Sequence, residues 1–296
     1  MSTSTDAAPA AQNHGRAGRD VPLSIVTAVV LIALIAASLL VVKSLFIVLV
    51  IAALSLGVWE LRRGLLSIDL DLPQLPITLG GAAMIGSAYV WGANALVTAT
   101  AMTALGTLLY LFRRGVEGYV RTATAAIFTV IYLPFLGSFV ALMLAEGGHR
   151  WSTSPNLHDV GVRGVATFIA LVVASDVGGF VAGVLFGKHP MAPIISPKKS
   201  WEGFAGSAVA TFAAGIGLVV GLFHGHWYVG ALLGVIAVAM AVLGDLVESV
   251  IKRDLGVKDM SQIIPGHGGI MDRLDSLLAT VAPVWLVLHY WVLKGH

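Results

Sequence analysis

The feature that most constrains this chain is a succession of long apolar stretches. About 20 apolar residues are needed to cross a lipid bilayer as a helix. Nine such stretches follow one another, at residues 21–42, 44–61, 74–92, 94–112, 122–145, 164–187, 203–223, 228–248 and 276–293. Only 11% of the 296 residues are charged and 57% are hydrophobic, whereas soluble domains carry about 25% charged residues. We therefore expect an all-α, polytopic integral membrane protein with about nine transmembrane helices.

The polar residues divide the chain into three parts. Residues 1–20 are small and polar, which is typical of a disordered tail. Residues 21–145 form apolar spans whose sequence identifies no chemistry. Residues 146–296 contain polar loops at 188–202 and 249–275, and we expect this region to be catalytic. The chain has no cysteine, which excludes a disulfide framework, a thiolate metal site and a cysteine nucleophile.

The basic residues predict the orientation of the helices, because Lys and Arg are enriched in short cytoplasmic loops. With a cytoplasmic N-terminus, 14 of the 18 Lys and Arg residues fall in cytoplasmic segments. The other four are Lys43, Arg150, Arg163 and Lys294. This predicts a plasma or inner membrane protein with a cytoplasmic tail and both long polar loops in the cytoplasm. The tight turn at 91–94 and the single charge at Lys43 leave eight or ten helices as alternatives.

One helix end carries a stripe of polar side chains. Asp245, Glu248, Ser249 and Lys252 have the spacing i, i+3, i+4 and i+7, which places them on one helix face. A charge at the centre of a bilayer costs at least about 2.5 kcal/mol, so this face must meet protein or water. Such a stripe suits a hard metal ion at its acidic end and phosphate oxygens at its basic end. The alternative is an ion-pair ladder within the helix, with Glu248 and Lys252 at the favourable spacing.

The next apolar span begins with a similar pattern, in which Asp272, Asp275 and Ser276 repeat the i, i+3, i+4 spacing. Two carboxylates on each of two helix ends suit Mg²⁺, which prefers oxygen ligands and retains waters and substrate phosphates. Capping of the helix N-terminus is the alternative for these two aspartates. Gly268 and Gly269 lie in the preceding turn, whose backbone N–H groups can approach an anion. A plain loop is the alternative there.

Two further features extend the polar set. Asp176 is the only charge within residues 164–187, and an acid inside a membrane span is a functional candidate, with a hydrogen-bonded structural acid as the alternative. Gly179 and Gly183 follow it at four-residue spacing, which predicts close helix packing. The segment SPKKS supplies cations and hydroxyls suited to phosphate, and a solvated basic loop is the alternative. Its candidate residues are Ser196, Lys198, Lys199 and Ser200.

The run SVIKRDLGVKDMSQIIPGHGGIMDRLDS, residues 249–276, closely resembles the signature of phosphatidate cytidylyltransferases, also called CDP-diacylglycerol synthases. In that family the pattern is S-x-x-K-R-x₄-K-D, then a P-G-H-G-G turn, then D-R-x-D. The pieces GDLVES, SPKKSWEG and SDVGGF also look like blocks of the family, so the resemblance covers roughly residues 165–296. It implies the reaction of CTP with phosphatidic acid to give CDP-diacylglycerol and pyrophosphate, a step of phospholipid biosynthesis.

Roles for individual residues follow from the resemblance together with their chemistry. The expected metal ligands are Asp245 and Asp272, with Glu248, Asp275 and Asp176 as neighbours or further ligands. The expected phosphate-binding cations are Lys198, Lys199, Lys252, Arg253, Lys258 and Arg273. The expected hydrogen-bond donors to substrate are Ser196, Ser200, Ser249, Gly268 and Gly269. We expect His267 to orient or protonate the leaving pyrophosphate, with a structural role in the turn as the alternative.

The implied cofactor is Mg²⁺, and the implied partners are CTP, phosphatidic acid and membrane lipids. The net charge of +2 is too small to indicate a nucleic-acid partner. A monovalent cation such as K⁺ beside Mg²⁺, and a homodimer, are compatible with the sequence. Two other functions stay open. A CTP-dependent polyprenol-type lipid kinase would transfer the γ-phosphoryl group, and an ion-coupled transporter would use Asp176 and Asp245 as ion sites. The confinement of polar chemistry to one half disfavours the transporter.

Overall fold

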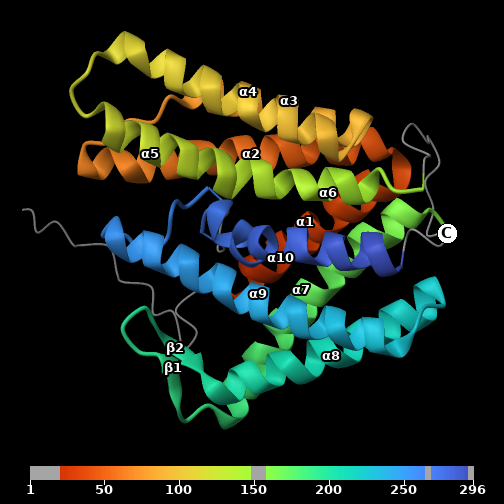
Figure 1. Cartoon of the computed structure of the whole chain (residues 1–296). Helices are drawn as coiled ribbons and strands as arrows, with labels where there is room; N and C mark the ends of the chain where they lie inside the picture. Colours follow the sequence, from red (N-terminus) through yellow and green to blue (C-terminus); the bar gives the residue numbers. More distant parts are fainter. Residues whose placement is uncertain (1–20, 148–157, 264–267, 293–296) are drawn as a thin grey trace, which may run out of the picture.

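The structure, a computed structural model, describes residues 21–147, 158–263 and 268–292, and it is almost entirely helical (Figure 1). The first half contains α1 (Val21–Val41), α2 (Lys43–Leu65), α3 (Gln74–Trp91), α4 (Ala93–Leu111), α5 (Tyr119–Val130) and α6 (Leu136–Leu144). The second half contains α7 (Val160–Phe186), α8 (Trp201–Phe223), α9 (Trp227–Asp254) and α10 (Met271–Trp291). Three short helical turns are η1 (Leu66–Ile68), η2 (Phe112–Arg114) and η3 (Ile131–Phe135).

Each apolar stretch predicted from the sequence coincides with a helical segment. The stretch at 122–145 corresponds to α5, η3 and α6, which form one continuous segment with a π-helical turn at Pro134, because proline cannot donate the regular backbone hydrogen bond. Seven helical segments of the described chain are long and apolar enough to cross a membrane, and this set leaves out α1 and α3. The polytopic membrane architecture is therefore confirmed, but length and hydropathy do not confirm the predicted count of nine.

Helix α10 occupies the centre of the fold, between α2 and α6 on one side and α7 and α9 on the other (Figure 1). Its contact with α9 is close at Gly244, where an added Cβ would lie 2.5 Å from the backbone oxygen of Asp275. Glycine at this position allows the two backbones to touch. As a result Asp245, the next residue of α9, lies directly beside the first turns of α10.

Helices α7 and α8 also pack closely. An added Cβ at Gly179 would lie 2.5 Å from Ser207 Oγ, and one at Gly183 would contact the Cα of Gly203 at 3.8 Å. Small residues at such positions let membrane helices approach one another. The predicted packing role of Gly179 and Gly183 is confirmed.

The predicted loop at 188–202 contains a β-hairpin, which departs from a purely all-α fold. Strand β1 (Pro190–Ala192) pairs antiparallel with β2 (Ser196–Ser200), and β2 leads directly into α8 (Figure 1). The pairing was not predicted because the segment is short and lacks the alternating apolar pattern of a strand. The hairpin gives Lys198 and Lys199 a defined position at the start of α8.

Two side chains fix the base of this hairpin. Glu202 Oε2 accepts hydrogen bonds from the backbone N–H groups of Lys188 and His189, at 3.1 and 3.2 Å. Ser200 Oγ caps α8 by accepting a hydrogen bond from the backbone N–H of Gly203 at 3.1 Å, as expected for serine at an N-cap. The hairpin is thereby tied to the helix that follows it.

Candidate active site

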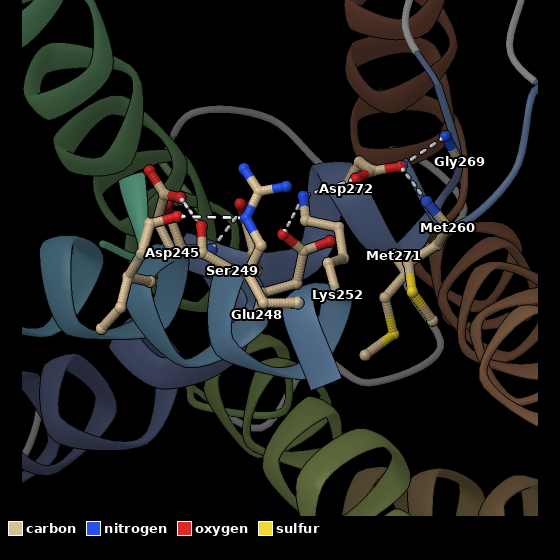
Figure 2. Close-up of polar contacts among 12 residues, drawn as sticks. Asp245, Glu248, Ser249, Lys252, Met260, Gly269, Met271 and Asp272 are labelled. Atoms are coloured by element: carbon tan, nitrogen blue, oxygen red, sulfur yellow. Dashed lines mark hydrogen bonds and ion pairs between the residues drawn. The ribbon is translucent and has the colours of Figure 1, made fainter. Parts of the chain in front are cut away.

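The polar face predicted around residues 245–252 is present on α9 (Figure 2). Helix α9 continues to Asp254 and α10 begins at Met271, so most of this face and both α10 aspartates lie on helices rather than in a 249–275 loop. Glu248 is fully buried and forms an ion pair with Lys252, one turn further along the helix. This contact matches the ion-pair ladder that the sequence left open.

Lys252 does more than pair with Glu248 on its own helix. Its Nζ also donates a hydrogen bond of 2.8 Å to Asp272 Oδ1 on α10 (Figure 2). The half-buried ammonium group lies between two carboxylates and compensates part of their negative charge. Lys252 therefore joins the acidic faces of α9 and α10.

Asp272 also organises the turn before α10. Its Oδ2 accepts hydrogen bonds from the backbone N–H groups of Gly269 and Met260, at 2.8 and 3.1 Å (Figure 2). Gly268 has a φ of +83°, a conformation that favours glycine. These contacts support a structural role for Asp272 at the start of α10. Its role as a metal ligand stays a prediction, as do the substrate contacts of Gly268 and Gly269.

A polar cavity of about 230 Å³ lies where α7, α8, α9 and β2 meet. Its charged and hydroxyl side chains include Asp176, Lys198, Lys199, Ser200, Asp245 and Ser276. Lys199 Nζ lies 2.5 Å from Asp245 Oδ2, and Ser249 Oγ donates to Asp245 Oδ1 at 3.4 Å (Figure 2). The structure thus brings together the predicted residues of four separate sequence segments around one cavity.

A second cavity, of about 330 Å³, is almost entirely apolar. Its walls come from α1, α2, α6, α7 and α10 and include Phe46, Val50 and Phe168. The polar residues that line it are Asp176, Asp272, Arg273, Asp275 and Ser276. Asp176 and Ser276 line both cavities, so the polar and the apolar cavity adjoin at these two residues.

The carboxylates at this junction have the donor chemistry of a Mg²⁺ site. Asp176, Asp245 and Asp275 come from three helices and are close enough to interact electrostatically. Glu248 Oε1 is buried and has no hydrogen-bond partner in the described part of the chain. Within residues 21–147, 158–263 and 268–292, however, no three acidic or histidine side chains converge on one point. Carboxylate oxygens are the donors that Mg²⁺ prefers, and Mg²⁺ also retains waters and substrate phosphates.

The remaining predicted residues surround this centre or lie away from it. Arg253 Nε donates to the backbone oxygen of Ile195 at 3.4 Å, which ties the hairpin to α9. Ser196 is half-buried at the start of β2, and Lys258 is exposed beyond the end of α9. The catalytic prediction for His267 lies outside the described residues.

Comparison with known proteins adds to this geometry. Residues 23–291 match the model of the cytidylyltransferase family. The chain belongs to this family. A phosphatidate cytidylyltransferase of Mycobacterium bovis is 38% identical to this cytidylyltransferase over 292 residues, which cover 94% of this chain and 91% of the relative. One from Mycobacterium leprae is 36% identical over 295 residues, covering 94% and 90%. One from Pseudomonas aeruginosa is 34% identical over 273 residues, covering 89% and 95%.

One polar residue that the sequence did not single out contacts the start of α10 in this cytidylyltransferase. Glu60 of α2 accepts hydrogen bonds from Ser261 and from the backbone at the start of α10. It was overlooked because it lies near the end of an apolar stretch, beside Arg62 and Arg63, where a solvated helix end is expected. The available signal was a lone acid within a predicted span, the same signal that identified Asp176.

Proposed function

We propose that this cytidylyltransferase transfers the cytidylyl group of CTP to phosphatidic acid, forming CDP-diacylglycerol and pyrophosphate. The observation that carries the proposal is the meeting of a polar and an apolar cavity at Asp176 and Ser276. A reaction between a water-soluble triphosphate and a membrane lipid needs such a junction. The relatives that cover the chain are named phosphatidate cytidylyltransferases, which supports the same substrates.

The chemistry requires no nucleophilic side chain. A phosphate monoester is mostly dianionic at pH 7, since its second pKa is about 6. One of its oxygens forms a bond to the α-phosphorus of CTP, while the bond from that phosphorus to the oxygen bridging to the β-phosphorus breaks. Pyrophosphate leaves with the electron pair. The main obstacle is repulsion between two anionic phosphates, so the protein must position them and compensate their charge.

The basic residues divide between the two substrates. Lys198 and Lys199 on β2 face the polar cavity and hold the triphosphate. Arg273 lines the apolar cavity and holds the phosphate of phosphatidic acid where the lipid meets the acidic residues. Lys252 keeps α9 and α10 together through its contacts with Glu248 and Asp272. Each of these cations therefore has its own task, which is to bind the triphosphate, to bind the lipid phosphate or to hold the two helices together.

The carboxylates provide the metal-binding groups. Asp245 and Asp272 are the main proposed ligands, and Glu248, Asp275 and Asp176 are the further candidates. When bound there, Mg²⁺ supplies positive charge that lowers the repulsion between the triphosphate and the lipid phosphate. Lys199 lies against Asp245 and is well placed to bind a phosphate beside this ligand. A monovalent cation such as K⁺ and a homodimer stay predictions.

The proposed topology has nine membrane crossings with a cytoplasmic N-terminus. Contacts group the helix ends into two sets. Lys43 bonds to Leu144 and Asp159 at one end of the helices. Arg62 and Arg114 both pair with Asp71 at the other end. These two sets of helix ends support a topology in which successive helices, including α3, run in opposite directions.

Labelling of single cysteines in intact cells tests the orientation. An impermeant thiol reagent should reach His226→Cys and not Ser67→Cys, and the reverse pattern would reject the proposed orientation.

Product analysis tests the reaction. Purified protein in detergent is given phosphatidic acid, Mg²⁺, and CTP labelled separately in the base and in the γ-phosphate. The base label should enter the lipid fraction while the γ label appears in pyrophosphate. A γ label in the lipid would identify a kinase instead. No transfer to any phospholipid would reject the proposed function altogether.

A further inference from the structure

Glu60 is a fully buried carboxylate in the half of the chain that lacks the family signature. It lies on α2, yet its hydrogen-bond partners are about 200 residues away in sequence. Its Oε1 accepts from Ser261 Oγ at 2.5 Å and from the backbone N–H of Ile270 at 2.9 Å. Its Oε2 accepts from the backbone N–H of Met271 at 2.7 Å. All these donors lie in the segment that leads into α10.

A buried carboxylate is stable only when its charge is compensated by donors. Glu60 obtains this compensation from backbone N–H groups at the N-terminus of α10, where such groups have no partner within the helix and the helix dipole favours a negative charge. The contact stabilises the acid and fixes the start of the helix at the same time. Since Asp272 follows Met271 directly, the contact ends one residue before a predicted metal ligand.

The turn before α10 is shaped to admit this carboxylate. An added Cβ at Gly269 would lie 2.7 Å from Glu60 Oε2 and 2.8 Å from Oε1. A side chain at this position would push the carboxylate away from Ile270 and Met271. Glycine is therefore required at position 269 so that Glu60 can reach the α10 backbone. This reason differs from the predicted approach of a substrate phosphate to the same turn.

We propose that Glu60 is a positioning residue for the transfer reaction. It fixes the first turn of α10, and with it Asp272 and Asp275, relative to the acidic face of α9. Glu60 is not among the residues that line either cavity, so it acts through α10 and not on the substrates. The inference rests on the proposed function, because it assigns a catalytic consequence to the position of α10.

The test compares carboxylates at the two ends of α10. Glu60→Gln keeps the shape of the side chain but turns one acceptor oxygen into an NH₂ group that opposes a backbone N–H. Glu60→Asp keeps the charge but withdraws it by one methylene from the α10 backbone. The matched control is Glu146→Gln, because Glu146 bonds to Trp285 and His289 near the other end of α10. For each variant, kcat, both KM values and the unfolding temperature in detergent are measured on folded protein.

Both Glu60 variants should lower kcat by about 10- to 100-fold, since displacement of reacting groups by about 1 Å has effects of this size. The KM for phosphatidic acid should change by less than about twofold, as the apolar cavity is intact. Glu146→Gln should keep the wild-type kcat even if it lowers the unfolding temperature. A lower unfolding temperature with unchanged kcat in either folded Glu60 variant would overturn the positioning role. Failure of the wild-type protein to transfer CMP would instead reject the proposed function.

Discussion

Helices α1–α6 and helices α7–α10 differ in where they place charged side chains. In the first group, Arg62 and Arg114 pair with Asp71 at partly exposed helix ends, at 2.7 and 3.2 Å. In the second group, Glu248, Lys252 and Asp272 interact on facing helix surfaces, and Glu248 and Asp272 are buried. Exposed ion pairs contribute little to stability, whereas charges inside a membrane protein are costly and are kept for function. We propose that the first group supports the fold and that the second group carries the reaction.

Two charged residues of α2 are buried and connect the two groups. Lys43 pairs with Asp159 at the start of α7, and Glu60 accepts hydrogen bonds from the start of α10. The supporting helices therefore do more than surround the site, since one of them fixes the start of α10.

The largest effect is expected from the two main proposed metal ligands, Asp245 on α9 and Asp272 on α10. Asp245→Asn and Asp272→Asn should each lower kcat by about 100-fold or more, the scale of losing one essential electrostatic contact in an active site. Each change keeps the side-chain shape and removes a hard anionic ligand. Asp71→Asn is the matched control from the first group, and its turnover should stay within about twofold of wild type. Near-normal Mg²⁺-dependent activity in either site variant would exclude that residue as a metal ligand.

A smaller effect is expected from the hairpin. Lys199→Ala should raise the KM for CTP about tenfold, since a hydrogen bond to a charged group contributes about 1.5 kcal/mol. Lys188→Ala offers a control on the same segment, because Lys188 is exposed and is not among the residues that line the polar cavity. Steady-state kinetics with varied CTP measures both. If both variants have the same KM for CTP, Lys199 does not bind the triphosphate.

The smallest effect is expected at the helix ends of the first group. Arg114→Ala removes a partly exposed ion pair with Asp71 and should lower the free energy of unfolding by about 0.2–1 kcal/mol. Turnover should not change. Chemical unfolding in detergent, together with the product assay, measures the two quantities. A marked loss of turnover would show that the first group contributes charge to the reaction and would weaken the comparison.

Patterns that repeat within a few residues could be interpreted correctly from the sequence. The apolar stretches became helices, and the polar face from Asp245 to Lys252 is present on α9, because helix periodicity is a local property. The spacing of Asp272 and Asp275 was likewise recognised as helical, although the predicted loop at 249–275 put the start of α10 too late in the sequence.

Contacts between segments that are distant in sequence could not be predicted from such local patterns. Nothing near Glu60 in the sequence indicates that its carboxylate meets Ile270, and nothing near Lys199 indicates contact with Asp245. The β-hairpin was also missed, because its pairing is stabilised by Glu202 and by the capping of α8 rather than by strand periodicity. The two adjoining cavities arise only from the packing of several helices.

In the proposed arrangement, phosphatidic acid reaches the acidic residues through the apolar cavity while CTP occupies the polar one. Photo-crosslinking with phosphatidic acid that carries a diazirine in one acyl chain tests this arrangement. Mass spectrometry should locate crosslinks at cavity residues such as Val50 and Phe168, and excess unmodified phosphatidic acid should abolish them. Crosslinks spread over exposed α4 residues such as Leu105 and Leu109, unaffected by the competitor, would show that the lipid does not bind in the apolar cavity.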